Sequence, residues 1–134
     1  MLYLSCFSVK EVQQLVSMFY GNCHCEAVKF KFLSEFEVIE EGMRCNCSIC
    51  SRKGVILSNF VVNPEDLEID DPVGFLNHYQ FGTGVAKHYF CSKCGISPFV
   101  KTRLNPGCYR INLGCIDGVD SLSLKEIFYQ GTEI

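Results

Sequence analysis

The spacing of apolar residues in this chain changes from a helical period to a strand period after Phe19. An S-x-x-E capping sequence at Ser8 precedes a run of apolar residues with helical spacing. The apolar positions of this run are Val9, Val12, Leu15, Val16 and Phe19. The pattern predicts a short amphipathic helix, which divides the chain into an N-terminal helical extension, residues 1–19, and a domain over residues 20–134.

Beyond the predicted helix, apolar and polar positions alternate. Val28, Phe30 and Phe32 alternate with Lys29 and Lys31, which is typical of a half-buried strand. Further segments rich in β-forming residues lie at 55–57, 60–62, 75–81, 85–90, 109–113 and 127–129. Asn-Pro and Gly-Thr-Gly sequences provide turns between some of them. The pattern therefore predicts a mostly β single domain with short strands.

Composition and charge restrict the function classes. The 134 residues are 48% hydrophobic and 20% charged, which suits one globular domain with a small core. A formal charge of −3 disfavours a general binder of the nucleic-acid phosphate backbone, because such proteins are normally basic. No apolar run is long enough to span a membrane, and the first residues lack a secretory signal pattern. We therefore expect a cytoplasmic or nuclear protein in a reducing compartment.

Seven of the ten cysteines form three short motifs. The motifs are C-x-C at Cys23 and Cys25, C-x-C-x-x-C at Cys45, Cys47 and Cys50, and C-x-x-C-G at Cys91 and Cys94. In a reducing compartment such close spacings are typical of metal ligands, whereas disulfide frameworks belong to secreted proteins. Tetrahedral zinc takes four ligands, so seven sulfurs fill one site and leave three for a second. We therefore predict two Zn²⁺ ions per chain.

The first and third motifs together predict a closed structural zinc site. Residues i and i+2 of a strand project to one face, so Cys23 and Cys25 are expected to present both sulfurs from a strand. Cys91 and Cys94 are expected to flank a tight turn, in which Gly95 supplies a positive φ. Such a site would tie together parts of the chain that are 66 residues apart, from Cys25 to Cys91.

The second motif offers three sulfurs, from Cys45, Cys47 and Cys50, without an obvious fourth ligand beside them. Three protein ligands and an open position are typical of catalytic zinc. The alternative is a closed site that a residue from elsewhere in the chain completes. The candidates for such a fourth ligand are Cys6, His24, His78, His88, Cys108 and Cys115. We interpret Cys108 and Cys115 as small buried side chains, and the histidines as residues that support a ligand or face solvent.

The chemistry of an open three-sulfur site favours a thiol substrate. A Zn²⁺ ion with three thiolate ligands carries a net negative charge, which weakens it as an activator of water. Soft sulfur surroundings suit a further sulfur ligand, so we expect a small thiol held as its thiolate. Arg52 and Lys53 follow the motif and are candidates to meet a substrate carboxylate, with a solvated surface charge cluster as the alternative.

Three segments of the sequence carry a resemblance to a known family. They are GNCHCEAV at 21–28, CNCSIC at 45–50 and YFCSKCG at 89–95. In order and in flanking residues these segments resemble the glutathione-dependent formaldehyde-activating enzyme family, also called the centromere protein V family. The resemblance runs from about Phe19 to near the C-terminus. The residues within its motifs are more similar to those of the animal centromere protein V branch than to those of the bacterial enzymes.

The resemblance implies a fold, a metal content and an activity. The implied fold is a zinc-bearing Mss4-like, or β-tent, architecture. The implied ligands are Cys23, Cys25, Cys91 and Cys94 for a structural zinc, and Cys45, Cys47 and Cys50 for a catalytic zinc that glutathione sulfur approaches. The implied activity is a carbon–sulfur lyase reaction that joins formaldehyde and glutathione into S-hydroxymethylglutathione. The centromere protein V branch implies an alternative, a non-enzymatic zinc-stabilised module that binds chromatin or other proteins.

Overall fold

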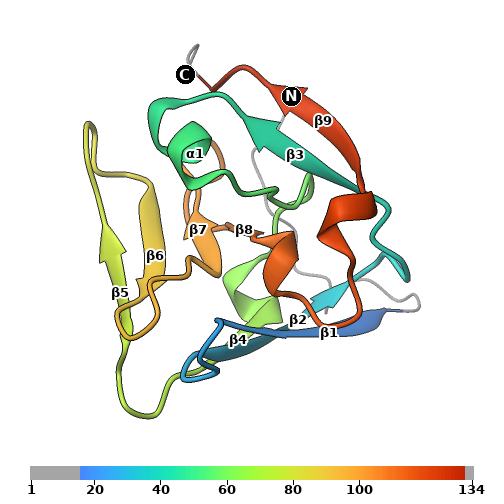
Figure 1. Cartoon of the computed structure of the whole chain (residues 1–134), viewed down its shortest axis with the longest axis horizontal. Helices are drawn as coiled ribbons and strands as arrows, with labels where there is room; N and C mark the ends of the chain where they lie inside the picture. The colour runs from blue at the N-terminus through green and yellow to red at the C-terminus, as the bar shows by residue number, and fades with distance from the viewer. Residues whose placement is uncertain (1–15, 132–134) are drawn as a thin grey trace.

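Three small β-sheets surround a common apolar core in the computed structural model, which describes residues 16–131 (Figure 1). The strands are short, and the helical elements of this region are one six-residue α-helix and three 3-10 turns. The predicted mostly β class is therefore confirmed. Within the described residues no helix is both long enough and apolar enough to cross a membrane.

The first sheet is antiparallel and has the strand order β1-β2-β4. Its strands are β1 (Ser17–Asn22), β2 (Lys29–Ser34) and β4 (Leu67–Asp70). The predicted alternation in β2 is confirmed, because Phe30 and Phe32 are buried while the lysines between and before them face outward. This sheet lies in the lower part of the molecule in Figure 1, and it contributes the aromatic side chains Phe30 and Phe32 to the core.

Strand β1 limits the predicted N-terminal helix. The helical spacing of apolar residues extends through Phe19, but the chain is already a strand from Ser17. Phe19 lies directly opposite Phe32 in the β1–β2 register, and their rings stack with centroids 5.5 Å apart. Pairing with a neighbouring strand and an aromatic partner outweighs the local helical spacing here. The remainder of the predicted helix lies in residues 1–15, outside the described part of the chain.

The second sheet is an antiparallel meander with the order β5-β6-β7-β8. Its strands are β5 (Leu76–Tyr79), β6 (Lys87–Cys91), β7 (Phe99–Lys101) and β8 (Tyr109–Ile111). The strands predicted within 75–81, 85–90 and 109–113 are therefore present, although shorter than predicted. Strand β7 was not predicted, because three residues are too few to establish an alternating pattern.

The third sheet joins two strands that are far apart in the sequence. Strand β3 (Glu41–Cys45) pairs in parallel with β9 (Lys125–Tyr129), so Cys45 lies opposite Tyr129. The predicted strand at 127–129 is thus confirmed, and the pairing brings the C-terminal part of the domain to the second cysteine motif (Figure 1). The predicted segments 55–57 and 60–62 form only isolated bridges rather than strands.

The core lies between the three sheets and connects the two cysteine regions. The buried residues of its largest cluster are Phe30, Phe32, Ile39, Ile56, Val62, Phe99, Tyr109, Ile111, Leu113 and Ile116. Phe99 is fully buried and meets Phe30 and Tyr109 edge-on, with both ring centroids 5.5 Å away. Burial of each large side chain contributes roughly 1.5–3 kcal/mol, so this small core holds the sheets in place with little redundancy.

Candidate metal centre

The first and third cysteine motifs meet in space, as predicted. The sulfurs of Cys23, Cys25, Cys91 and Cys94 all lie within 4.8 Å of one another. The first pair does not project from a strand, and that prediction is wrong. Both residues lie in the turn between β1 and β2, which the Glu26 amide closes by donating to the Cys23 carbonyl at 3.1 Å. The turn allows Cys23 and Cys25 to converge because its backbone curves toward the second pair.

The second pair lies on a turn at the end of the meander strand β6. Cys91 is the last residue of β6, and Cys94 belongs to the turn that follows. Gly95 has φ of +83°, and its amide donates to the Cys91 carbonyl at 2.7 Å. The positive φ predicted for Gly95 is confirmed, and it explains why glycine follows the motif.

The four sulfurs fit the geometry of a tetrahedral zinc site. The sulfur of Cys25 lies 3.6 Å from that of Cys23 and 3.7 Å from that of Cys91. A tetrahedron with Zn–S bonds of about 2.3 Å requires sulfurs about 3.8 Å apart. Cys23 and Cys91 are fully buried, whereas Cys25 and Cys94 are partly exposed. A set of four thiols that fills all four positions of a metal is typical of a structural site.

Neighbouring groups shift the pKa values of two of these thiols in opposite directions. Burial raises the pKa of Cys94, but amide donors from Ile96 and Cys25 and thiol donors in the cluster outweigh burial and lower this pKa to about 6. An amide of Ala27 lowers the pKa of Cys25, but burial and contacts with the other thiols raise it overall to about 11. The metal-free cluster therefore favours one thiolate, and full metal ligation must release further protons.

The second motif builds its three-sulfur cluster from the end of β3 and the start of α1 (Ser48–Lys53). Cys45 ends β3, Cys47 is the N-cap of α1, and Cys50 lies inside the helix. The Cys47 sulfur accepts from the Cys50 amide at 3.4 Å, and the Cys45 sulfur accepts from the Cys47 amide at 3.5 Å. The sequence pattern does not predict this helix, although its first turn, together with the end of β3, brings the three sulfurs within 4.8 Å of one another.

These three thiols also differ in acidity. Burial raises the pKa of Cys50, and its contact with Cys47 raises it further. Burial also raises the pKa of Cys47. Amide donors from Cys50 and Ile49 and thiol donors from its neighbours outweigh burial, so the pKa of Cys47 is lowered overall. Cys47 is therefore the first of the three to ionise and the natural first ligand for an incoming cation.

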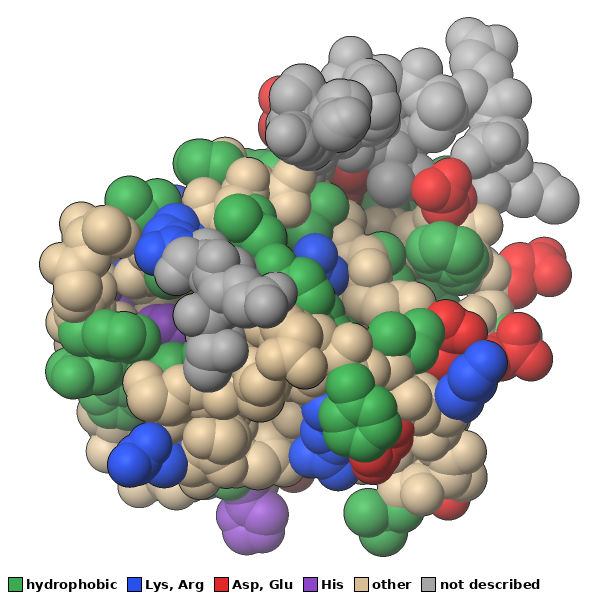
Figure 2. Space-filling view, turned by 90° about the horizontal axis from the view of Figure 1, so that it is seen from above, with side chains coloured by type: hydrophobic (Ala, Val, Ile, Leu, Met, Phe, Trp, Pro, Cys, Tyr) green, Lys and Arg blue, Asp and Glu red, His purple; other side chains and the backbone are tan. Residues whose placement is uncertain are grey.

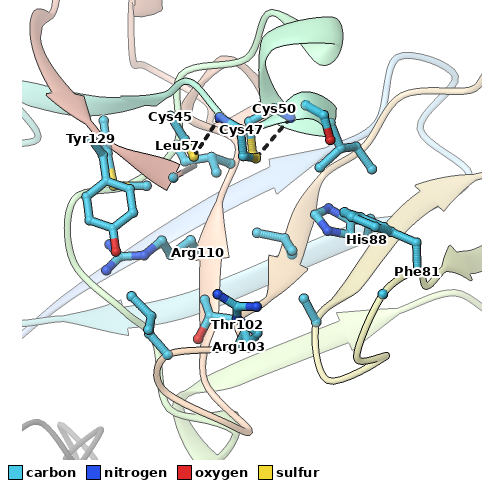
Figure 3. Close-up of a pocket in the computed structure, with 18 of the residues that line it drawn as sticks. Cys45, Cys47, Cys50, Leu57, Phe81, His88, Thr102, Arg103, Arg110 and Tyr129 are labelled. Atoms are coloured by element: carbon cyan, nitrogen blue, oxygen red, sulfur yellow. Dashed lines mark hydrogen bonds between the residues drawn. The ribbon is translucent and has the colours of Figure 1, made fainter. Parts of the chain in front are cut away.

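The three-sulfur cluster forms one wall of a cavity of about 420 Å³. Figure 3 shows the three cysteines on one side, Thr102 and Arg103 on the opposite side, Arg110 and Tyr129 at one flank, and His88 with Phe81 at the other. The remaining lining is mainly apolar, with Met43, Ile49, Leu57, Ala86, Val100 and Leu104. Small-molecule sites commonly have volumes of about 300–1000 Å³, so this cavity is large enough for a substrate.

No protein group completes the three-sulfur cluster within residues 16–131. The described candidates for a fourth ligand, His24, His78, His88, Cys108 and Cys115, all stay outside it. Cys108 is buried, as its interpretation as a small buried side chain requires, but it is also disulfide-bonded, which the sequence pattern does not predict. Cys6 lies outside the described residues. Burial raises the pKa of Cys115 to about 12, with added contributions from Cys23 and Cys94. The fourth position of a metal at this cluster thus faces the cavity.

The cations that line the cavity are not Arg52 and Lys53. Arg52 donates to the Ser48 carbonyl at 2.8 Å on the helix surface and does not line the cavity, which agrees with the alternative of a solvated surface charge. Lys53 is partly buried and does not line the cavity, and its amine contacts His88. Arg103 and Arg110 do line the cavity. Periodicity assigned Arg110 only to a polar strand position, so its place in a cavity was not visible from the sequence.

Arg110 and Arg103 differ in their protein contacts. Arg110 donates to the Ser58 carbonyl at 2.9 Å, and burial lowers its pKa although Tyr129 and Cys45 oppose this shift. Arg103 makes no hydrogen bond or ion pair with the rest of the described chain, and its guanidinium borders the cavity. A cation without a protein partner at a cavity wall is suited to an anionic group of a ligand.

The model of the family described as glutathione-dependent formaldehyde-activating enzyme matches residues 18–131. The chain belongs to this family. A crystal structure of a Rhodobacter sphaeroides protein is also similar, with 35% sequence identity and a TM-score of 0.68 over 82% of this chain and 99% of that one. Both cysteine clusters lie inside the matched region, so the resemblance drawn from the cysteine motifs is confirmed, and the clusters have spacings consistent with zinc.

In this member of the glutathione-dependent formaldehyde-activating enzyme family, Gly131 limits the space beside the three-sulfur cluster. A methyl group added at Gly131 would overlap the Cys45 sulfur and approach the Cys47 Cβ at 2.9 Å. We expect Gly131→Ala to weaken metal binding at this cluster by roughly 10- to 100-fold, because displaced ligands lose their geometry. Competition with a chelator measures this affinity.

The control for this variant is Gly114→Ala. A methyl group there meets only side-chain oxygens, of Asn112 at 3.3 Å and Ser121 at 3.6 Å, and it should leave both metal affinities unchanged. Wild-type affinity in Gly131→Ala would contradict the close approach of Gly131 to Cys45.

Proposed function

We propose that this protein is a zinc-dependent carbon–sulfur lyase that acts on a thiol adduct, with S-hydroxymethylglutathione formation from glutathione and formaldehyde as its reaction. One observation carries the proposal. The three-sulfur cluster of Cys45, Cys47 and Cys50 borders a cavity of about 420 Å³, and its fourth position has no ligand among residues 16–131. An incoming thiol can therefore occupy this position without displacing a described protein group.

The proposal assigns one Zn²⁺ to each cysteine cluster. The cluster of Cys23, Cys25, Cys91 and Cys94 suits the structural ion, because it already contains four ligands. The second ion belongs to the three-sulfur cluster. When bound there, zinc lowers the pKa of a substrate thiol and stabilises its thiolate, which is the nucleophilic form.

The side chains of the cavity supply binding and orientation. Arg103 lies across the cavity from the cysteines and Arg110 lies at its flank, and both suit the carboxylates of a peptide-like thiol such as glutathione (Figure 3). The apolar lining around Leu57 and Val100 limits water near the sulfur, which strengthens the interaction between charges. In this arrangement the substrate sulfur points to the cluster while its carboxylates reach the arginines.

The alternative is a non-enzymatic, zinc-stabilised interaction module for chromatin or other proteins. The surface in Figure 2 gives this alternative little support as a nucleic-acid binder. Acidic side chains gather toward one side of that face, and lysines and arginines are scattered among other residues. Phosphate-backbone binding needs clustered positive charge, and the whole chain has a formal charge of −3.

We also propose that the three sheets form the Mss4-like, or β-tent, architecture and that the protein works in the cytoplasm or nucleus. Family membership supports the architecture. The thiols of both cysteine clusters are free, which supports a reducing compartment because oxidising conditions would compete with metal ligation, although Cys108 is disulfide-bonded.

Glutathione titration of the cobalt-substituted protein tests the proposed function. We expect a saturable change in the visible cobalt absorption, because a thiolate enters the open position of one of two metal ions. Two bound ions without any spectral change would show that both sites are closed to thiols, and the protein would then be a zinc-built binding module.

A matched pair of variants tests the assigned binding mode. We expect Arg103→Met to weaken glutathione binding by roughly 10- to 100-fold, which corresponds to the about 1.5–3 kcal/mol of a hydrogen bond to a charged group. Binding of 2-mercaptoethanol, which lacks carboxylates, should not change. Arg52→Met removes a cation outside the cavity and serves as the control. Equal loss for both thiols would contradict a carboxylate contact at Arg103.

A further inference from the structure

A partly buried lysine and a buried histidine form a pair at the edge of the cavity. Lys53 is at the end of α1 and His88 is on β6, so their contact joins two elements that are 35 residues apart. The Lys53 amine lies 3.1 Å from His88 Nδ1 and 3.4 Å from the Ser97 hydroxyl. The Ser97 hydroxyl in turn donates to the Tyr89 carbonyl. The proposed function does not use either residue.

The contact with Lys53 determines which nitrogen of His88 carries the proton. A protonated lysine amine has three donors and no acceptor, so Nδ1 of His88 must accept. The imidazole is then neutral and carries its hydrogen on Nε2. Burial lowers the pKa of Lys53, and negative charge at Cys50 and Cys47 opposes this shift.

The second nitrogen of His88 faces the cavity. His88 is one of the lining residues, and Figure 3 shows its ring beside Phe81 at the cavity flank. The two rings stack with centroids 5.7 Å apart, which restrains the imidazole plane. Within residues 16–131 every fully buried polar side-chain atom has a hydrogen-bond partner. His88 forms a hydrogen bond only through Nδ1, so its Nε2, which has no partner in this region, is not fully buried. Nε2 is therefore accessible from the cavity and available to a ligand.

We propose that His88 donates a proton to the carbonyl oxygen of the substrate, and that Lys53 is the positioning residue that holds His88 in its Nε2–H form and replaces the proton. This inference rests on the proposed function, because it assumes a thiol and a carbonyl compound in the cavity. The carbonyl substrate belongs to the class of small aldehydes. His88 lies at the cavity flank next to the cysteine wall, where the oxygen of an aldehyde attacked by a bound thiolate would lie (Figure 3).

The step balances in atoms and protons. The thiolate sulfur attacks the carbonyl carbon, so a C–S bond forms while the π bond of C=O breaks. The oxygen takes the proton from Nε2, and Nδ1 takes one from the Lys53 ammonium, which leaves the imidazole neutral in its Nδ1–H form. Nε2 then recovers a proton from solvent, to which the thiol released its own on ionising, and Nδ1 returns its proton to the Lys53 amine, so the starting tautomer is restored. No electron is gained or lost, and the reverse sequence cleaves the adduct.

The charges around His88 agree with a neutral donor. Burial and, to a smaller extent, the charge of Lys53 together lower the pKa of His88 to about 4. Arg103 and Arg110 add positive charge to the same cavity, whereas thiolates formed in the cysteine cluster supply the opposing negative charge. His88 therefore stays uncharged near neutral pH, and it acts as a neutral hydrogen-bond donor rather than as an imidazolium.

Substitutions at both residues test the pair. We expect His88→Leu to lower kcat for thiol addition to formaldehyde by about 100-fold or more, with unchanged glutathione affinity in the cobalt titration. His88→Gln retains an amide donor and should lose less. Lys53→Met should lower kcat by less than His88→Leu, again without a change in KM for the thiol. The control is His78→Leu, which removes an exposed histidine of β5 outside the cavity.

Nitrogen NMR of the zinc-loaded protein supplies a measurement that does not depend on turnover. We expect the Nε2–H tautomer of His88 at pH 7 in the wild type, and a mixture of tautomers in Lys53→Met. A predominant Nδ1–H tautomer, or kcat of His88→Leu within threefold of the wild type, would overturn the assignment. Failure of the proposed function is distinguishable, because it removes thiol binding and turnover from the wild type itself.

Discussion

Cys94→Ser is expected to release one metal ion and to unfold the domain. Structural zinc contributes apparent binding free energies of about 10–16 kcal/mol in small peptides, which equals or exceeds the about 5–15 kcal/mol stability of a typical domain. Serine fits the space, but its hydroxyl does not ionise as a ligand must. Loss of this ligand leaves Cys23 and Cys91 fully buried without the ion that holds them together.

Metal analysis and thermal unfolding followed by circular dichroism would measure this effect. The matched control is Cys115→Ser, which changes a free, partly buried cysteine outside both clusters. Cys115→Ser should retain two metal ions and a cooperative transition. A Cys94→Ser protein with two ions and a wild-type melting temperature would show that the four-sulfur cluster is not what stabilises the fold.

Cys47→Ser is expected to abolish thiol binding and turnover in a protein that stays folded. The loss of activity should exceed the roughly 10- to 100-fold that accompanies loss of a group supporting a ligand, because Cys47 is itself a ligand in the proposed site. Serine is a favourable N-cap, so its hydroxyl can accept from the Cys50 amide and α1 keeps its start. The substitution therefore separates metal binding from helix capping.

The measurements are metal content, cobalt absorption with glutathione, and melting temperature. One metal ion per chain, no response to thiol and a cooperative melt are the expected results. Cys47 is only partly buried, so a serine there leaves no large cavity. Glutathione affinity equal to that of the wild type would refute the three-sulfur cluster as the thiol site.

The cysteine grouping was predictable because ligand spacing is a local property of the sequence. Cys23, Cys25, Cys91 and Cys94 were assigned to one site from two short motifs, and their sulfurs do converge. The backbone that carries the first pair was not predictable in the same way. C-x-C spacing fits a strand, but a turn in which Glu26 has φ of +66° also brings the sulfurs of Cys23 and Cys25 together.

The surroundings of the second cluster depended on contacts that sequence periodicity does not record. Arg110 has the alternation of a strand residue, and only the packing of β8 behind the cluster places its side chain in the cavity. Arg52 lies close to Cys50 in sequence but bonds back to the Ser48 carbonyl, as helical spacing of four residues allows. Proximity in sequence was therefore a poor guide to the cavity lining.

The short helix and the parallel strand pair were missed for different reasons. α1 has six residues with a single buried one, Cys50, so no apolar period identifies it. Strand β9 was predicted, but its partner β3 lies more than eighty positions earlier, as Cys45 and Tyr129 show. Parallel pairing over such a distance depends on the whole fold rather than on either strand.

Because the segments that form each cysteine cluster are far apart in the sequence, their separation determines when each cluster can be completed during synthesis on the ribosome. Cys25 must wait for Cys91, 66 residues later, which takes roughly 3 to 13 s at synthesis rates of about 5–20 residues per second. The three-sulfur cluster waits longer, because β9 and Gly131 border it. The nascent chain therefore exposes unligated thiols during translation, until the segments that complete each cluster have been synthesised.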